Sequence, residues 1–393
     1  MSAGTQKLYY LEGVRGIASF LVFLHHFLLV FYTAYYNWMV CDTHLGCWDI
    51  RYGQSVFSFL TNGNFHVDIF FVLSGFVLSR KYFQTNDLSI VISGAYKRFI
   101  RIYVPVAFAL IVAYILLEAR LYFNTGVAAI AHSSWWFGNM WTFPHPFAKL
   151  CQSLAYSTMF MGDGSLDTTL WTMSLELFGS YFIFSFLALT HGTTKRGMLL
   201  LAVLAYFLVT DQSRFCCFAL GISLNYLERL LAKRKSVSSL LALLLLIVGL
   251  ALGSYPPNDP VKGTLFFNLP SKLWQYSGWF NVAGSYLLLT AVMMSKHLQR
   301  FFSAAIFRFL AFISFSLYLL HPLVLGSVSS YAFLRLYPGM GYNPTVIAVF
   351  VITTAVCMGL SWVMAKYIDA NGIRLADWFY LKSEGKTDKK TIY

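Results

Sequence analysis

Ionisable residues recur inside the apolar stretches of this sequence, where they are costly to bury and usually serve a function. The first stretch carries Arg15 and, eleven residues later, His26. In a helix this spacing is about three turns, or roughly 16 Å, and places both side chains on nearly the same face. Because an imidazole is a good general base near neutral pH, we expect a cavity shared by a cation and a base. His25 points about 100° away, so the two rings cannot share one role, and a histidine that only hydrogen-bonds a neighbouring helix is the alternative.

Two later stretches carry further polar residues. Glu176 lies roughly two turns into its stretch, which favours a function or a buried ion pair over exposure to lipid. Ser314, Tyr318 and His321 share one helical face through their i, i+4, i+7 spacing. Three polar groups on one face favour a cavity wall over a packing stripe. Pro322 beside them is expected to kink the helix and to free backbone carbonyls.

Basic residues gather where the second apolar stretch ends and the third begins. Arg80 and Lys81 follow the second stretch, and Arg98 and Arg101 lie on one helical face before the third. The phosphates of a soluble ligand would bind such residues through charge-assisted hydrogen bonds, and snorkelling to lipid phosphates is the alternative. Together with Arg15, these four residues are called the basic collar.

The second stretch also contains residues whose roles stay open. His66 and Asp68 lie near its start, where a surface position and a functional one fit the sequence equally well. Ser74 and Gly75 are small, which favours close packing between helices. No Cys/His spacing in the sequence resembles a zinc site, so no bound metal is expected.

Composition identifies the elements that must position these residues. Of 393 residues 58% are hydrophobic and 11% are charged, against roughly 25% charged in a soluble domain. The apolar residues come in blocks near the roughly 20 that cross a bilayer, whereas a closed barrel would alternate over about ten residues. The sequence therefore predicts an all-α integral membrane protein, a polytopic bundle of about ten transmembrane helices. The expected spans are 16–36, 56–79, 104–122, 169–190, 197–210, 212–230, 237–254, 278–294, 309–331 and 345–368.

Charge predicts the orientation of this bundle. The net charge of +13 reflects topology rather than nucleic-acid binding, because the basic residues lie beside the span ends. With both termini in the cytosol, all but seven of the 29 Lys and Arg residues are cytosolic. Cys41 and Cys47 then share the first loop on the other side, where we expect a disulfide. No loop holds a soluble domain, so residues 1–393 are expected to form one transmembrane domain with a short basic cytosolic tail, 369–393.

In this order, the segments resemble the acyltransferase-three family of integral membrane acyltransferases, over residues 11 to about 325. The motifs that carry the resemblance are Arg-Gly-x-Ala…His (Arg15 to His26), Val-Asp-x-Phe-Phe-Val-Leu-Ser-Gly-Phe (Val67 to Phe76), Arg-x-x-Arg-Ile-Tyr (Arg98 to Tyr103), Trp-x-x-Ser-x-Glu (Trp171 to Glu176) and Ser-x-Ser-Leu-Tyr-Leu-x-His-Pro (Ser314 to Pro322). The sequence departs from the pattern by the second histidine, His25, and by Val104 between the aromatic residue and the proline.

The resemblance implies transfer of an acyl group, often acetyl, from a coenzyme A thioester to a hydroxyl of a carbohydrate, lipid or small metabolite. It also implies that His26 is the key histidine and that Arg15 is the first-span arginine. Acyl-coenzyme A is then a co-substrate and membrane lipids are partners. A secondary transporter is the alternative, since buried His, Glu and Arg also form proton relays, but no inverted repeat is apparent. A non-catalytic scaffold fits less well with so many buried ionisable groups.

The expected mechanism distributes these residues between binding and chemistry. The basic collar holds the phosphates of coenzyme A, and neutral His26 takes a proton from the acceptor hydroxyl as it attacks the thioester. Glu176 is expected to orient that imidazole, and a route through an acyl-histidine is the alternative to direct attack. Tyr318 and Ser314 are candidate donors to the oxyanion, and His321 completes the polar wall.

Overall fold

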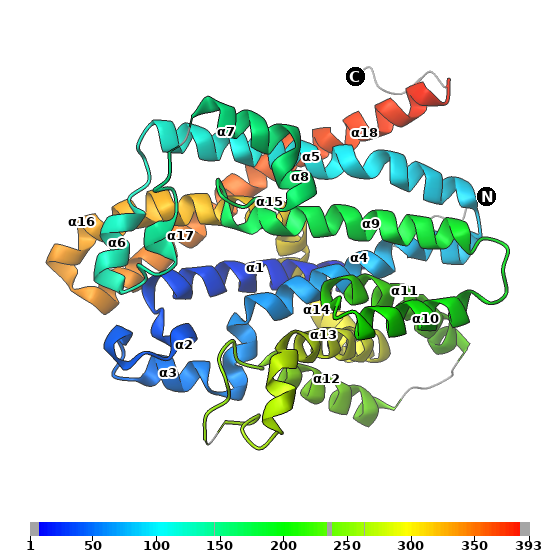
Figure 1. Cartoon of the computed structure of the whole chain (residues 1–393), viewed down its shortest axis with the longest axis horizontal. Helices are drawn as coiled ribbons and strands as arrows, with labels where there is room; N and C mark the ends of the chain where they lie inside the picture. The colour runs from blue at the N-terminus through cyan, green and yellow to red at the C-terminus, as the bar shows by residue number, and fades with distance from the viewer. Residues whose placement is uncertain (1–7, 145, 234–237, 263, 386–393) are drawn as a thin grey trace.

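The computed structural model describes residues 8–144, 146–233, 238–262 and 264–385, and this part of the chain contains helices and no strands (Figure 1). Ten helices of the described chain overlap the ten predicted spans, which confirms the all-α polytopic fold. Their bounds are α1 (Tyr9–Phe31), α4 (Gly63–Thr85), α5 (Leu88–Glu118), α9 (Trp171–Leu189), α10 (Arg196–Val209), α11 (Ser213–Lys233), α12 (Ser239–Gly253), α13 (Ser277–Met294), α15 (Ala305–Val324) and α17 (Tyr342–Met364).

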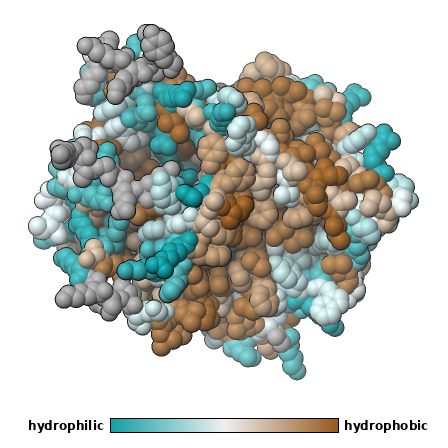
Figure 2. Space-filling model, turned by 180° about the vertical axis from the view of Figure 1, so that it is seen from behind, coloured by the Kyte–Doolittle hydropathy of each residue, from teal (hydrophilic) through white to brown (hydrophobic). Residues whose placement is uncertain are grey.

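Helix length and surface hydropathy make this bundle an integral, multi-pass membrane protein. Six helical segments of the described chain are long and apolar enough to cross a bilayer, and α10, α12 and α13 are shorter apolar helices. In Figure 2, hydrophobic residues cover the middle of the face shown, and hydrophilic residues gather toward its two edges. The 14 residues of α10 reach only about 21 Å, less than the roughly 30 Å of a hydrocarbon core.

Shorter elements connect these helices. Before α9 they are α2 (Ala34–Asn37), η1 (Val40–Asp42), α3 (Trp48–Gly53), η2 (Val56–Thr61), α6 (Asn124–Ala131), η3 (Phe137–Asn139), α7 (Phe147–Gln152), the π-helical η4 (Ser153–Ser157), α8 (Thr158–Met161) and η5 (Thr168–Leu170). After α12 they are η6 (Ser271–Tyr276), α14 (Lys296–Phe302), the π-helical η7 (Leu325–Ser329), α16 (Ser330–Met340), the π-helical η8 (Ala365–Asp369) and α18 (Ala370–Ser383).

Several boundaries differ from the sequence prediction, beginning with α1, which covers residues 9–31 rather than 16–36. The second span begins at Gly63 rather than at residue 56, because Asn62 caps α4 by accepting the N–H of Phe65 at 3.2 Å. The third span starts at Leu88, so Arg98 and Arg101 lie inside a helix of 31 residues. Much of the predicted tail forms α18, which packs along α5, with Lys97 Nζ 2.9 Å from Asp377 Oδ1. The last eight residues, 386–393, lie outside the described part.

Glycines allow the helices around α1 to approach closely. A Cβ atom at Gly16 would lie 2.4 Å from the backbone N of Ala311, and one at Gly13 would lie 1.9 Å from the carbonyl O of Phe302. Because no side chain intervenes, α15 packs directly along α1. Gly75 makes the same close contact with α11, where a Cβ would lie 2.2 Å from the carbonyl O of Phe218, as the small-residue pattern predicts.

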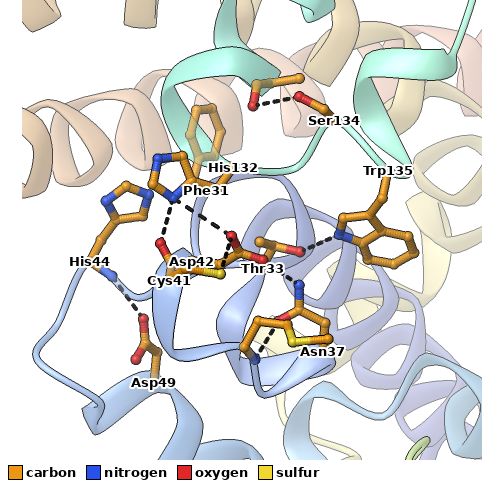
Figure 3. Close-up of polar contacts among 12 residues, drawn as sticks. Phe31, Thr33, Asn37, Cys41, Asp42, His44, Asp49, His132, Ser134 and Trp135 are labelled. Atoms are coloured by element: carbon orange, nitrogen blue, oxygen red, sulfur yellow. Dashed lines mark hydrogen bonds and ion pairs between the residues drawn. The ribbon is translucent and has the colours of Figure 1, made fainter.

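A cap of short elements, residues 33–61 and 124–141, covers the end of the bundle where α1 terminates (Figure 1). Figure 3 shows its polar contacts: His132 Nδ1 donates to the Cys41 carbonyl at 3.0 Å, and the Asp49 carboxylate accepts the backbone N–H of His44 at 3.1 Å. The rings of His44 and His132 lie 5.1 Å apart. Burial, followed by the proximity of His132, lowers the pKa of His44, so the two rings are not both charged near neutral pH.

The disulfide predicted between Cys41 and Cys47 is not formed. The Cys41 Sγ instead lies 3.5 Å from Oδ1 of its neighbour Asp42, and Cys47 adopts a left-handed backbone, with φ of 68°, directly before α3. Side-chain hydrogen bonds, rather than a covalent bond, hold this loop to the rest of the cap.

Candidate active site

A cavity of about 640 Å³ opens at the end of the bundle where α1 begins, which we call the N-terminal end. This volume lies within the usual range for small-molecule sites, about 300 to 1,000 Å³. Residues from α1, α4, α5, α9, α15 and the α17–α18 junction line it: Leu8, Leu11, Glu12, Arg15, Val67, Phe70, Phe71, Leu73, Ser74, Phe76, Val77, Leu78, Arg80, Lys81, Arg98, Arg101, Ile102, Thr172, Met173, Glu176, Ala311, Phe312, Ser314, Phe315, Tyr318, Asp369 and Ile373. All five residues of the basic collar are among them.

Two residues of the basic collar already have carboxylate partners. Arg80 donates from Nη2 to Glu228 at 2.8 Å and from Nε at 3.0 Å. Arg98 forms an ion pair with Glu176, and both side chains are about 15% exposed. A guanidinium that is already paired with a carboxylate attracts a phosphate less strongly.

The other collar residues are open to the cavity. The Arg15 side chain is exposed within it and makes one weak hydrogen bond, from Nη2 to the carbonyl O of Ala311 at 3.5 Å. Arg101 and Lys81 are also exposed. Two acidic residues of the lining lie near these cations: Glu12 of α1 near Arg15, and Asp369, from the α17–α18 junction, near Arg15 and Arg101. Arg15, Arg101 and Lys81 are therefore the cations best placed to receive an anionic ligand.

Glu176 does not orient His26, contrary to the expectation from sequence. Its Oε1 accepts a hydrogen bond from Ser74 at 2.7 Å as well as the ion pair from Arg98. Arg98 also donates to the Ser180 hydroxyl at 2.7 Å. The carboxylate therefore ties α9 to α4 and α5 in the wall of the cavity. Sequence alone could not separate this buried pairing from a catalytic contact, because both place a carboxylate two turns into α9.

We predict that Glu176→Gln and Arg98→Met each lower the thermal unfolding midpoint in detergent, because each leaves a mostly buried partner without its counter-charge. The coupling between the two residues should be about 1 to 3 kcal/mol. Consequently the double variant Arg98→Met with Glu176→Leu should lose less stability than the two single losses combined. Additive losses would show that the pair contributes no coupling.

Tyr318 forms the inner end of the cavity together with Phe70 and Thr172. Its hydroxyl lies 3.0 Å from the hydroxyl of Thr172, and its backbone carbonyl accepts the Thr169 hydroxyl at 3.2 Å. That carbonyl is free because Pro322, four residues later, has no N–H, as the sequence predicts.

Ser314 also lines the cavity, but both of its oxygens already have hydrogen-bond partners. Its hydroxyl donates to the carbonyl O of Ala311 at 2.9 Å, within α15. Its own carbonyl accepts the Ser19 hydroxyl of α1 at 2.7 Å. Of the two predicted oxyanion donors, Tyr318 therefore has the hydroxyl nearer to the inner end of the cavity.

His26 and His321 form a pair directly behind this inner end. His321 Nε2 lies 2.9 Å from His26 Nδ1, and the two rings are 5.0 Å apart. Neither ring lines the cavity, but the Tyr318 ring, at 6.2 Å from that of His321, reaches from the cavity to the pair. His321 is fully buried. The α1–α15 contact thus brings together two predicted site residues that are 295 positions apart.

The hydrogen bonds fix the tautomers of both neutral rings. The His321 Nδ1 lies 2.8 Å from the carbonyl O of Leu317, which can only accept, so this nitrogen carries the proton. The Nε2 of His321 then accepts, and His26 must donate from Nδ1, which also lies 3.1 Å from the carbonyl O of Val22. The lone pair of His26 is therefore on Nε2, where it is available as a base.

His25 belongs to a different environment. Its Nδ1 lies 2.7 Å from the carbonyl O of Thr61 and 2.7 Å from the Tyr35 hydroxyl, both in the cap. A Cβ at Gly63 would lie 2.7 Å from the His25 ring, so α4 begins in close contact with it. His25 therefore holds the cap to α1, on the face that the 100° rotation predicts.

His66 and Asp68, whose positions were left open, are both buried. Asp68 forms an ion pair with Arg214 of α11, and Arg214 also donates to Asn64 at 2.9 Å. Its pairing depends on the packing of α4 against α11, which local sequence does not reveal.

Sequence reasoning also missed Trp136 of the cap. Its indole stacks on the His26 ring at 5.6 Å between ring centres, with 16° between the planes. Aromatic residues are abundant in this chain, so neither composition nor spacing singles out this one. Within the described residues, no group of three or more His, Cys, Asp or Glu side chains could hold a metal ion.

Comparison with known protein families assigns most of the chain to one family. The family model described as an acyltransferase domain, that of the acyltransferase-three family, matches residues 8–362. The match covers the basic collar, both members of the histidine pair and the cavity lining except Asp369 and Ile373. No curated protein and no solved structure gives a significant match.

Proposed function

The chain belongs to the acyltransferase-three family of membrane acyltransferases, and on that premise we propose that it moves an acyl group, acetyl by preference, from acyl-coenzyme A to a hydroxyl of a carbohydrate, lipid or small metabolite. One observation carries the proposal: the cavity has cations at its mouth, and its inner end adjoins the His26–His321 pair. The tautomers of this pair leave the lone pair of His26 Nε2 available as a base. A phosphorylated donor with a reactive thioester at the far end of a long arm fits this arrangement.

Donor binding uses the exposed part of the basic collar. The phosphates of coenzyme A lie at Arg15, Arg101 and Lys81, where charge-assisted hydrogen bonds replace water. The pantetheine arm follows the apolar wall made by Phe70, Phe71 and other residues of α4 and α15. The thioester then reaches Tyr318, whose hydroxyl turns from Thr172 toward the carbonyl oxygen.

Transfer proceeds through a tetrahedral intermediate. His26 Nε2 takes the proton of the acceptor hydroxyl as that oxygen forms a bond to the thioester carbon. Tyr318 donates a hydrogen bond to the oxyanion. The C–S bond then breaks, the imidazolium returns the proton to the thiolate, and the products are an ester and coenzyme A. His321 accepts from His26 Nδ1 throughout and keeps the ring in the productive tautomer.

The N-terminal end of the bundle faces the cytosol in this proposal, because it carries the basic collar and because cytosolic acyl-coenzyme A must reach the cavity. We predict that a cysteine introduced in the 86–87 turn is labelled by an impermeant maleimide only from the cytosolic side. A cysteine at Trp48, in the cap, should be labelled only from the opposite side. The reverse pattern would place the donor cavity on the wrong side of the membrane.

We predict that Arg101→Gln raises the apparent KM for acyl-coenzyme A roughly 10- to 100-fold, the loss expected for one charge-assisted contact, with a much smaller change in kcat. The matched control is the double variant Arg80→Gln with Glu228→Gln. This control removes a collar arginine together with its partner and should change the KM much less. Steady-state kinetics in nanodiscs with the donor varied decides this, and an Arg101→Gln enzyme with normal KM would remove the phosphate role of Arg101.

Binding of radiolabelled acetyl-coenzyme A to the purified protein in nanodiscs tests the function itself. Saturable binding, competed by free coenzyme A and weakened by Arg101→Gln, supports the proposal. Comparison of ester-bearing metabolites and glycans between normal and deletion cells then identifies the acceptor. A protein that does not bind the thioester but carries protons or solutes across vesicles would instead be the transporter alternative.

A further inference from the structure

One face of the His26 ring is covered by Trp136. The indole and imidazole planes are 16° from parallel, with 5.6 Å between ring centres. Trp136 comes from the cap, not from a transmembrane helix, and its side chain is partly buried against the core. The imidazole that carries the free Nε2 thus has one face against an aromatic side chain of the cap.

The turn that carries Trp136 is firmly anchored. The carbonyl O of Ser133 accepts the N–H groups of Trp136 at 3.2 Å and of Phe137 at 2.9 Å. The buried Asn124 donates from Nδ2 to the carbonyls of Phe137 and Met140, both at 2.8 Å. These bonds anchor the backbone of the turn that presents the indole to His26.

A second set of contacts ties the same turn to the end of α1. Figure 3 shows the indole of Trp135 directed at Thr33, with Nε1 donating to the hydroxyl at 3.1 Å. Trp135 also stacks on Tyr36, with 5.9 Å between ring centres. Just before the turn, His132 bonds to the Cys41 carbonyl, so the first cap loop and the second are joined.

We propose, building on the transfer function above, that Trp136 determines which hydroxyl reaches His26 by excluding water from the cap side. His26 can take a proton from any O–H that reaches Nε2. If the oxygen belongs to the acceptor, the thioester carbon receives it and an ester forms. If it belongs to water, the C–S bond breaks in the same way, but the products are free carboxylic acid and coenzyme A. An acyltransferase must suppress the second reaction, and closing the site against water is how enzymes do so.

The acceptor therefore enters by displacing the indole with its own bulk, which water lacks. This makes Trp136 a specificity-determining residue, distinct from the histidine pair that performs the chemistry. Tyr318 lies at the inner end of the cavity, on the side from which the donor arrives, so we assign the approach of the acceptor to the cap side, at Trp136.

The first experiment measures hydrolysis of radiolabelled acetyl-coenzyme A by purified protein in nanodiscs, without added acceptor. Trp136→Ala should raise the release of labelled acetate and free thiol roughly tenfold or more over wild type. Trp48→Ala, an exposed cap tryptophan far from His26, should leave it unchanged. Adding His26→Ala to Trp136→Ala should abolish this increase in hydrolysis. Trp136→Leu provides the same test if the alanine variant does not fold.

The second experiment needs no activity. Diethyl pyrocarbonate modifies accessible neutral imidazoles, and mass spectrometry reads the modified histidines. The rate at His26, normalised to the exposed His297, should rise in Trp136→Ala and Trp136→Leu but not in Trp48→Ala. Unchanged modification of His26 in both Trp136 variants, or unchanged hydrolysis by a variant that still binds acetyl-coenzyme A, overturns the proposal. A wild-type protein that does not bind the donor refutes the transfer function, whereas the labelling result still decides whether the indole shields His26.

Discussion

Replacing His26 with alanine should lower the turnover number for acyl transfer by roughly 100- to 10,000-fold, the range for loss of a general base. The protein should still fold, because within the described part of the chain this ring hydrogen-bonds to His321 and to the backbone of its own helix. Binding of acyl-coenzyme A should persist, since the phosphates are held at the other end of the cavity. Transfer of label in nanodiscs, with binding measured on the same preparation, tests this result.

His25→Ala is the matched control for that experiment. His25 has the same side chain one position away, but it bonds to Thr61 and Tyr35 of the cap rather than to His321. We expect this variant to retain much of its activity, with a loss of stability that reflects the looser cap. An inactive His25→Ala together with an active His26→Ala would refute both the helical-face argument and the choice of the catalytic histidine.

His321→Phe should reduce turnover roughly 100-fold or more while leaving donor KM nearly unchanged, because His26 loses the shorter of the two hydrogen bonds from its Nδ1–H and keeps only that to the Val22 carbonyl. A phenyl ring keeps most of the volume but cannot accept that hydrogen bond. His321→Gln should recover part of the activity, since its side-chain carbonyl can accept from His26 Nδ1.

The pH dependence of turnover distinguishes this positioning role from a packing role. Loss of the acceptor changes the proton affinity of His26, so the pH profile of kcat should move in His321→Phe and move back toward wild type in His321→Gln. A purely structural His321 would lower the amount of folded enzyme and leave the profile in place. Equal activity in the Phe and Gln variants would contradict the positioning role.

Much of the fold could be read from the sequence, because hydrocarbon thickness imposes a length and an apolar composition on every span. The predicted spans agree with the helices except where capping or helix continuation intervenes, as at Asn62 before α4 and at Leu88 in α5. These boundaries depend on single hydrogen bonds and on packing against α18, which a hydropathy pattern does not contain. The disulfide prediction was wrong for a related reason, since two cysteines in one loop need not approach each other.

The sequence by itself determined which residues are chemically capable and which face of each helix they occupy, because helical periodicity is a local property of the chain. It placed Arg15 and His26 on one face, and Tyr318 and His321 on another, and it identified the collar. Only the tertiary structure decided their partners. The close approach of α1 and α15 at Gly16 brings His26 into contact with His321. Packing of α9 against α5 pairs Glu176 with Arg98. The folding of the cap places Trp136 against the imidazole of His26. Such contacts are set by the relative rotation and translation of whole helices, which depend on all of their packed side chains at once, so no local pattern in the sequence specifies them.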